Sequence, residues 1–119
     1  MSVADEAGQY SFTVYKGQSR RVAMCRKVGG VATNWTGYSG LCQVRTKVGA
    51  STVITEIAVS FDVDRTTGNF YLDFTEDSLA QLSAGLSYVY DVRMTKTGAD
   101  TLYPVKGTIS VATRVSLPT

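Results

Sequence analysis

Strict alternation of side-chain character over Tyr88–Met94 constrains the fold of this chain more than any other feature. Bulky apolar residues alternate there with polar or smaller ones. This pattern is typical of a β-strand that has one face in a core and the other in water. Most other long segments of the 119-residue chain show the same period of two. The sequence therefore predicts a small all-β domain.

Turn-forming residues separate the alternating segments. The predicted strands cover residues 10–15, 20–26, 41–47, 52–63, 70–74, 88–94 and 102–111. The run 52–63 is long enough for one bent strand or two short ones, and we favour a break near Ala58. Pro104 has no amide hydrogen, so the start of the last strand is expected at an edge or at a bulge.

Glycines and aromatic residues define the connections between the strands. Gly29 and Gly30 predict a tight hairpin or loop, and Asp64–Asn69 has the composition of a hairpin turn. The loop 33–40 is rich in turn formers but contains Trp35 and Tyr38. Rings of that size are expected to fold back over the core.

One segment departs from the period of two and predicts a short helix near residues 76–83. Thr75 is a suitable N-cap, and the acids that follow it favour the positive end of a helix. Leu79 and Leu82 lie on one side and are expected to pack on the sheet. Gly85 suits a left-handed stop.

The number and spacing of these segments predict an immunoglobulin-like β-sandwich of roughly 7–9 antiparallel strands. A length of 119 residues is that of one domain, 1–119, with polar tails at 1–9 and 112–119. The segment Met1–Gln9 carries acids and lacks the apolar run of a secretory signal, so we expect the chain to mature in the cytoplasm. No segment predicts a membrane-spanning helix.

The composition argues against most catalytic chemistry. The chain has no histidine, which is the commonest general base for nucleophilic catalysis. Cys25 and Cys42 match neither a disulfide framework nor a zinc site, so both are expected to be reduced and packed. The formal net charge of +2 favours no nucleic acid, membrane surface or acidic substrate. We therefore expect no enzyme and no catalytic, metal or cofactor-binding residues.

Carboxylates near the predicted 64–69 turn offer two further possibilities. Asp62 and Asp64 share one strand face and Asp73 points outward from the next strand, so a glycosidase-like pair is conceivable; a solvated sheet face is the stronger interpretation. The segment Asp62–Gly68 resembles a calcium loop only weakly, since its glycine falls one place late and no bidentate glutamate follows.

Basic residues cluster around the second predicted strand. They are Arg20, Arg21, Arg26 and Lys27, with Arg45 and Lys47 on a strand that could be its neighbour. A phosphate track interleaved with aromatic residues is one interpretation. A solvated face or a protein-docking patch is favoured, because the net charge is small and most aromatic residues take core positions.

Aromatic residues near turns define the last candidate site. Trp35 and Tyr38 are predicted to contribute to partner docking beside the cations. Together with Tyr103 they could instead stack on sugar rings, as in a carbohydrate-binding module. A tryptophan beside glycines is more often a core residue.

Spaced motifs along residues 10–112 resemble a known family. The motifs are Phe12 with Lys16-Gly17-Gln18-Ser19, Trp35–Gly40, Cys42–Arg45, Phe70–Thr75, the Leu79 and Leu82 helix, Ser87–Val92 and Lys106–Val111. They resemble the N-terminal β-sandwich domain of siphophage upper baseplate proteins, which also occurs as stand-alone virion proteins of tailed phages. Trp35 replaces the usual leucine of that family, and Cys42 replaces a larger apolar residue. The resemblance implies an assembly role and carries over no catalytic residue.

The expected function is therefore that of a non-enzymatic bacteriophage virion protein, made in the bacterial host cytoplasm. It would dock on the tail or baseplate through edge strands, tails and the Arg20–Lys27 region. Its partners would be other virion proteins in a multi-copy assembly, with no cofactor, nucleic acid or membrane. The alternatives are a capsid decoration protein, a carbohydrate-binding module and a small hydrolase.

Overall fold

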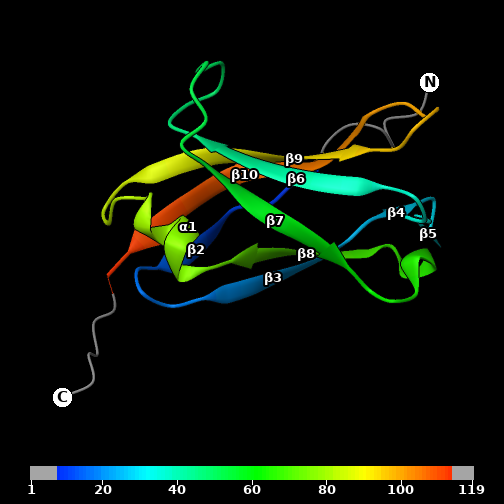
Figure 1. The fold of residues 1–119 in the computed structure, drawn as a ribbon, viewed down its shortest axis with the longest axis horizontal. Coiled ribbons are helices and arrows are strands. Elements are labelled where there is room, and N and C mark those ends of the chain that lie inside the picture. The colour runs from blue at the N-terminus through cyan, green and yellow to red at the C-terminus, as the bar shows by residue number, and fades with distance from the viewer. Residues whose placement is uncertain (1–7, 114–119) are drawn as a thin grey trace.

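Strands dominate residues 8–113, the part of the chain that the computed structural model describes (Figure 1). The elements are β1 (Gly8–Gln9), β2 (Phe12–Tyr15), β3 (Arg20–Cys25), β4 (Lys27–Val28), β5 (Val31–Ala32), β6 (Ser39–Arg45), β7 (Thr55–Phe61), the 3-10 helix η2 (Arg65–Thr67), β8 (Asn69–Phe74), α1 (Glu76–Ala80), β9 (Ser87–Thr95) and β10 (Leu102–Ala112). The all-β class and the single short α-helix predicted from the sequence are confirmed within these residues.

Most of these strands belong to one curled sheet of eight strands. Its order is β1-β10-β9-β6-β7-β8-β3, with β2 also paired to β10, while β4 and β5 form a separate hairpin. The expectation of antiparallel strands alone is wrong, because β1 and β2 run parallel to β10. The chain does turn between β2 and β3, but these strands do not pair with each other. They join opposite edges of the sheet, β2 beside β10 and β3 beside β8.

Strand β7 links the two parts of the sheet. Thr55 to Ala58 pair with β6, and Ala58 to Phe61 pair with β8, so Ala58 is in register with both neighbours. The predicted break near Ala58 is therefore wrong as a strand end. It is instead the point at which the strand changes partner.

The alternating residues point into one core, as their period predicts. Strand β9 places Tyr88, Tyr90, Val92 and Met94 inward, and all four are buried. The largest fully buried side chain in the described residues is Trp35. The core is completed by buried side chains from β2, β3, β6, β7, β8, β10 and the α1 region.

Helix α1 closes one end of the core. Thr75 caps it by a reciprocal pair of bonds with Ser78, in which the Ser78 amide donates to Thr75 Oγ1 at 3.1 Å and the Thr75 amide donates to Ser78 Oγ at 2.9 Å. Leu79 and Leu82 are buried as predicted. The Lys16 ammonium donates to the carbonyls of both leucines, at 3.0 and 2.7 Å, at the C-terminal end of the helix, where a positive charge is favourable.

Three predicted connections can be compared with the structure. Gly29 and Gly30, with φ of +59° and +83°, form the β4–β5 hairpin turn as predicted. The register of β10 against β9 shifts between Leu102 and Val105, so the irregularity expected around Pro104 is confirmed. Gly85 has a φ of +85° but lies in the turn before β9, because the helix has already ended at Ala80.

The predicted tails fall largely outside the described residues. Of the tail 1–9, Gly8 and Gln9 form β1, and of the tail 112–119, Ala112 ends β10. Within residues 8–113 the longest α-helix has five residues, and none has the length and apolar character needed to cross a bilayer.

Gly107 allows the first strands to lie against β10. A side-chain carbon at Gly107 would lie 2.0 Å from the Tyr10 carbonyl oxygen. That oxygen accepts a hydrogen bond from the Tyr90 hydroxyl at 2.6 Å, and the Tyr10 amide donates to the Lys106 carbonyl at 3.0 Å. The backbone between β1 and β2 therefore occupies the space that a side chain would need.

We expect Gly107→Ala to lower the free energy of unfolding by about 1–3 kcal/mol, because a methyl group must displace backbone rather than a flexible side chain. Urea unfolding measures the loss. The control is Gly8→Ala, whose new carbon would meet the Pro104 carbonyl at an ordinary 3.4 Å. Equal stability of the two variants would contradict the close approach at Tyr10.

Candidate docking surface

The cations predicted to dock a partner lie at the two ends of β3. Arg20 and Arg21 begin this strand, while Arg26 and Lys27 follow its last residue. Strand β3 is six residues long, so the two pairs are separated by most of its length. The structure thus places these cations along one sheet edge rather than in one compact patch.

The first pair is engaged with neighbouring strands. The Arg20 guanidinium donates to the Thr13 carbonyl of β2 and lies 5.8 Å from the centre of the Phe12 ring. Arg21 donates to Asp73 of β8 at 2.7 Å and lies over the Tyr71 ring. Arg21 is exposed, so this ion pair contributes little to stability.

The second pair borders a groove. Arg26 is held by its side-chain bond to Thr33 Oγ1 at 3.1 Å and by its amide bond to the Gly68 carbonyl at 3.0 Å. Lys27 is exposed at the start of the β4–β5 hairpin. Both residues line a groove of about 410 Å³ that runs between the end of β3 and the β1–β10 pair.

The aromatic residues predicted for the same surface lie elsewhere. Trp35 is 0% exposed, and its indole donates to the Gly68 carbonyl at 3.0 Å, so it belongs to the core, as its position beside glycines also predicted. Tyr38 is half-buried in a T-shaped contact with the Trp35 ring, and the Lys96 ammonium lies 5.5 Å from the centre of the Tyr38 ring. Neither residue is among those lining the groove.

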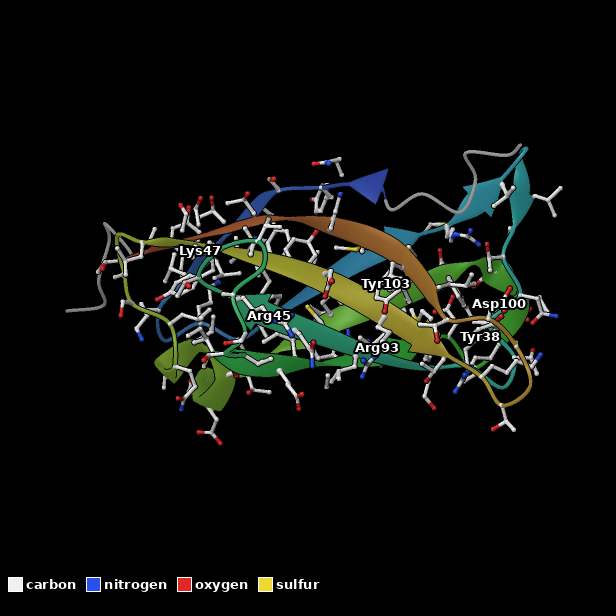
Figure 2. All side chains as sticks on the ribbon, turned by 90° about the horizontal axis from the view of Figure 1, so that it is seen from above. Tyr38, Arg45, Lys47, Arg93, Asp100 and Tyr103 are labelled. Atoms are coloured by element: carbon white, nitrogen blue, oxygen red, sulfur yellow. The ribbon has the colours of Figure 1, made fainter. Side chains whose placement is uncertain are left out.

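Arg45 and Lys47 do not extend the cations of β3. Strands β7 and β8 separate β6 from β3, so the expectation that these strands are neighbours is wrong. Figure 2 shows Arg45 and Lys47 toward one end of the long axis, Tyr38 and Asp100 toward the other, and Arg93 and Tyr103 between them. The cations therefore do not form the continuous track that a nucleic-acid backbone requires.

The free edge of β3 is the main functional feature that the local pattern did not predict. Within residues 8–113, β3 pairs with β8 only. The Arg26 amide bonds the Gly68 carbonyl in the same register, so antiparallel alternation directs the N–H and C=O groups of Arg21, Ala23 and Cys25 away from β8. Such an edge can accept a further strand.

The remaining groove residues come from distant parts of the sequence. Gln9, Tyr10, Pro104 and Val105 form the wall opposite β3, and Phe70 is also part of the lining. No local signal brings these residues together, because the wall depends on the parallel pairing of β1 with β10. The one usable signal was the Pro104 bulge, which marks irregular backbone at that end of β10.

Asp62 organises a hydrogen-bond network beside the β7–β8 turn. Its carboxylate accepts bonds from Tyr71 at 2.5 Å, Thr67 at 2.8 Å and Asn69 at 2.9 Å. These bonds, the one from Tyr71 first, lower the pKa of Asp62 below its usual value, and the same carboxylate raises the pKa of Tyr71. By accepting these three hydrogen bonds, the Asp62 carboxylate holds the β7–β8 turn in place.

Neither the carboxylate pair nor the calcium loop is assembled as an open site. Asp64 accepts bonds from the Thr66 amide and hydroxyl as the cap of η2, and Asp73 accepts from Arg21 and Ser60. No cluster of three or more potential metal-binding residues occurs in the described part of the chain.

The two cysteines differ in environment. Both are free, as expected, and Cys42 is buried in the core. Burial raises the pKa of the Cys42 thiol far above its usual value, and the nearby charge of Asp91 raises it further. Cys25 is exposed, contrary to the expectation that both thiols are packed, and it lines the groove.

No model of a protein family matches this sequence, and no curated protein matches it.

We expect acid to destabilise the fold partly through Asp62. Its folded-state pKa is lowered, so its stabilising contribution is complete above the unfolded-state pKa of about 3.9 and is lost as pH falls through the folded value. Urea unfolding of wild type and Asp62→Asn at about pH 6 and pH 3 should show the smaller loss in the variant. Asp100→Asn, in the exposed β9–β10 turn, is the control that should behave as wild type.

We expect Trp35→Ala to lower the free energy of unfolding by about 3–5 kcal/mol, because it removes the largest fully buried side chain. Urea unfolding followed by circular dichroism measures this loss. Since Trp35 is the only tryptophan, wild-type emission should also stay unchanged when sugars are added. A saturable change in this emission with a sugar would revive the carbohydrate-binding alternative.

Proposed function

We propose that this protein is a structural component of a tailed-phage virion that docks on the tail or baseplate through the edge of β3 and the cations at its ends. The observation that carries the proposal is that edge. Arg21, Ala23 and Cys25 direct backbone groups outward beside a groove, and Arg26 and Lys27 border the same groove. Main-chain groups presented in this way suit rigid assembly with another polypeptide.

The proposal includes an immunoglobulin-like arrangement of the curled sheet. Trp35 packs in the core just before β6, in the manner of the core tryptophan of such domains. The Tyr88 hydroxyl, at the start of β9, accepts a bond from the Ser83 amide at 2.8 Å, which resembles the tyrosine corner. The change of partner at Ala58 in β7 would carry the chain from one layer of a sandwich to the other.

The spaced residues that resemble the phage family support the same role. Phe70, Leu72 and Phe74 of β8 and Tyr88, Tyr90 and Val92 of β9 are all buried core residues. The Trp35–Gly40 loop leads directly into β6. The resemblance therefore rests on residues that hold the sheet together, which favours a shared fold and, with it, a shared assembly role.

In docking of this kind, the backbone and the side chains would have different roles. Backbone hydrogen bonds to the edge would provide most of the affinity, while exposed cations would steer an acidic partner and select its register. Lys27 is exposed and could take this role without a large desolvation cost, whereas Arg21, although exposed, would have to exchange its ion pair with Asp73 for one with the partner.

The test is to purify tailed-phage particles that carry this gene and to measure the protein by mass spectrometry and particle imaging. We expect several copies per particle at the tail or baseplate. Combined charge reversal, Arg21→Glu with Lys27→Glu, should reduce incorporation several-fold. The isolated variant should still fold, because these side chains lie on the surface.

The matched control is Lys47→Glu, the same charge change on a different part of the surface. It should be incorporated like wild type. Absence of the protein from intact particles would refute the virion role. Its presence on heads alone would replace tail docking with capsid decoration.

A further inference from the structure

The curled sheet brings its two ends close to each other. At one end of the gap, the Arg20 guanidinium spans from β3 to the Thr13 carbonyl of β2 and lies over Phe12. At the other end, Ala23, Met24 and Cys25 of β3 face Gly8, Gln9 and Tyr10 across the groove of about 410 Å³. The sheet is therefore joined at one corner and open at the other.

Both walls of the groove are strand edges. Strand β3 pairs with β8 and strand β1 pairs with β10, and no other strand of residues 8–113 is paired with either. On the β3 side, Ala23 and Cys25 direct N–H and C=O groups toward this gap by the alternation described above. The groove therefore offers a hydrogen-bonding template for an extended chain.

The lining determines what kind of chain fits. Phe70 and Val105 are buried apolar residues and Met24 is partly buried, so side chains pointing inward should be apolar. Among residues 8–113, the charged residues that line the groove are Arg26 and Lys27, and none of the lining residues in this range is acidic. Side chains pointing outward should therefore be acidic, and the basic edges of two β3 strands would repel each other.

We propose that this groove takes an extended acidic segment of a partner protein, which adds as a strand to the edge of β3. The segment has apolar residues at alternate positions, facing Phe70 and Met24, and acidic residues between them, near Arg26 and Lys27. This inference deepens the docking function proposed above by defining the chemistry of the docked partner. Insertion would fill the open corner and extend the hydrogen-bonded sheet toward β1.

Cys25 reports on the groove in the full-length protein, because it is the exposed thiol and Cys42 is buried. The probe is the peptide Ser-Val-Glu-Val-Glu-Val-Ser, and the readout is the rate of maleimide labelling followed by intact mass. At saturating peptide we expect labelling to slow at least tenfold. Cys25→Ser should remove the fast-reacting thiol and so confirm its assignment.

Two variants separate strand addition from other binding. Ala23→Pro removes an outward N–H donor without removing a bond to β8, so it should abolish protection, whereas Ala23→Ser should retain it. Lys27→Glu should weaken peptide binding about two- to fivefold, and Lys47→Glu should not. Tryptophan emission and circular dichroism confirm that each variant is folded; if Ala23→Pro is not, the Lys27 and peptide comparisons decide.

The matched peptide Ser-Val-Lys-Val-Lys-Val-Ser should protect Cys25 far less, and 0.5 M NaCl should reduce the difference between the peptides. Equal protection by both peptides, or no protection by the acidic one, would overturn the proposal. Protection that survives in Ala23→Pro would overturn strand addition. If Cys25 is unreactive without peptide at every protein dilution, this chain itself covers the groove. If Cys25 is unreactive only at high protein concentration, a second copy covers it. Either result would overturn the proposal that a separate partner protein occupies the groove.

These outcomes are independent of the virion test. A protein that is present in particles but does not bind the acidic peptide retains its proposed function and loses this mode of docking. A protein that binds the peptide but is absent from particles retains the strand-addition site and loses the virion role.

Discussion

The double register of Ala58 is the constraint on which the rest of the structure depends. Strand β7 pairs with β6 through its first half and with β8 through its second. Because the two pairings overlap only at Ala58, the two parts of the sheet can turn toward each other there, and the curled sheet encloses Trp35, Leu72 and Val92 within a single core. It also brings β3 and the β1–β10 pair toward each other at the far ends of the sheet. Core, edge and groove are thus consequences of one hydrogen-bonding arrangement.

The polar residues divide between holding the fold and presenting a surface. Asp62, Arg20 and Lys16 have their hydrogen-bonding capacity committed to turns, to a neighbouring strand and to the end of α1. Lys27 has no such commitment among the interactions of the described residues, and it lies beside the outward-facing backbone of β3. The cluster of cations that is continuous in sequence therefore separates into structural members and members available to a partner. A charge cluster by itself does not make this distinction.

The local sequence pattern was sufficient to predict the strands and the helix, but it was not sufficient to predict how the strands pair. The alternation of Tyr88–Met94, the glycines at 29 and 30 and the cap at Thr75 each depend on residues close in sequence, and the structure contains the strand, hairpin and helix that they predict. The parallel pairing of β1 and β2 with β10 joins residues near opposite ends of the chain, and no periodicity encodes it. The groove could not be predicted from the sequence for the same reason, because the pairing of β1 with β10 forms one of its walls. Exposure of Cys25 has a different origin, since Cys25 shares the outer face of β3 with the exposed Arg21 and Ala23, whereas Val22 on the opposite face is buried in the core.

Strand β10 is the partner of the first two strands, with Gly8 in register with Val105 and Phe12 in register with Ile109. During synthesis, β1 and β2 therefore have no partner until residues 105–112 have left the ribosome. Pairings of such large sequence separation must overcome the entropy of closing a long loop, so they are expected to form late and to slow folding. Until then the apolar side chains of Phe12 and Val14 are uncovered. During this interval, nascent chains on the same messenger RNA can associate incorrectly. The same order of events means that the groove does not exist until β10 is in place, so the proposed partner would recognise only copies in which this strand has paired.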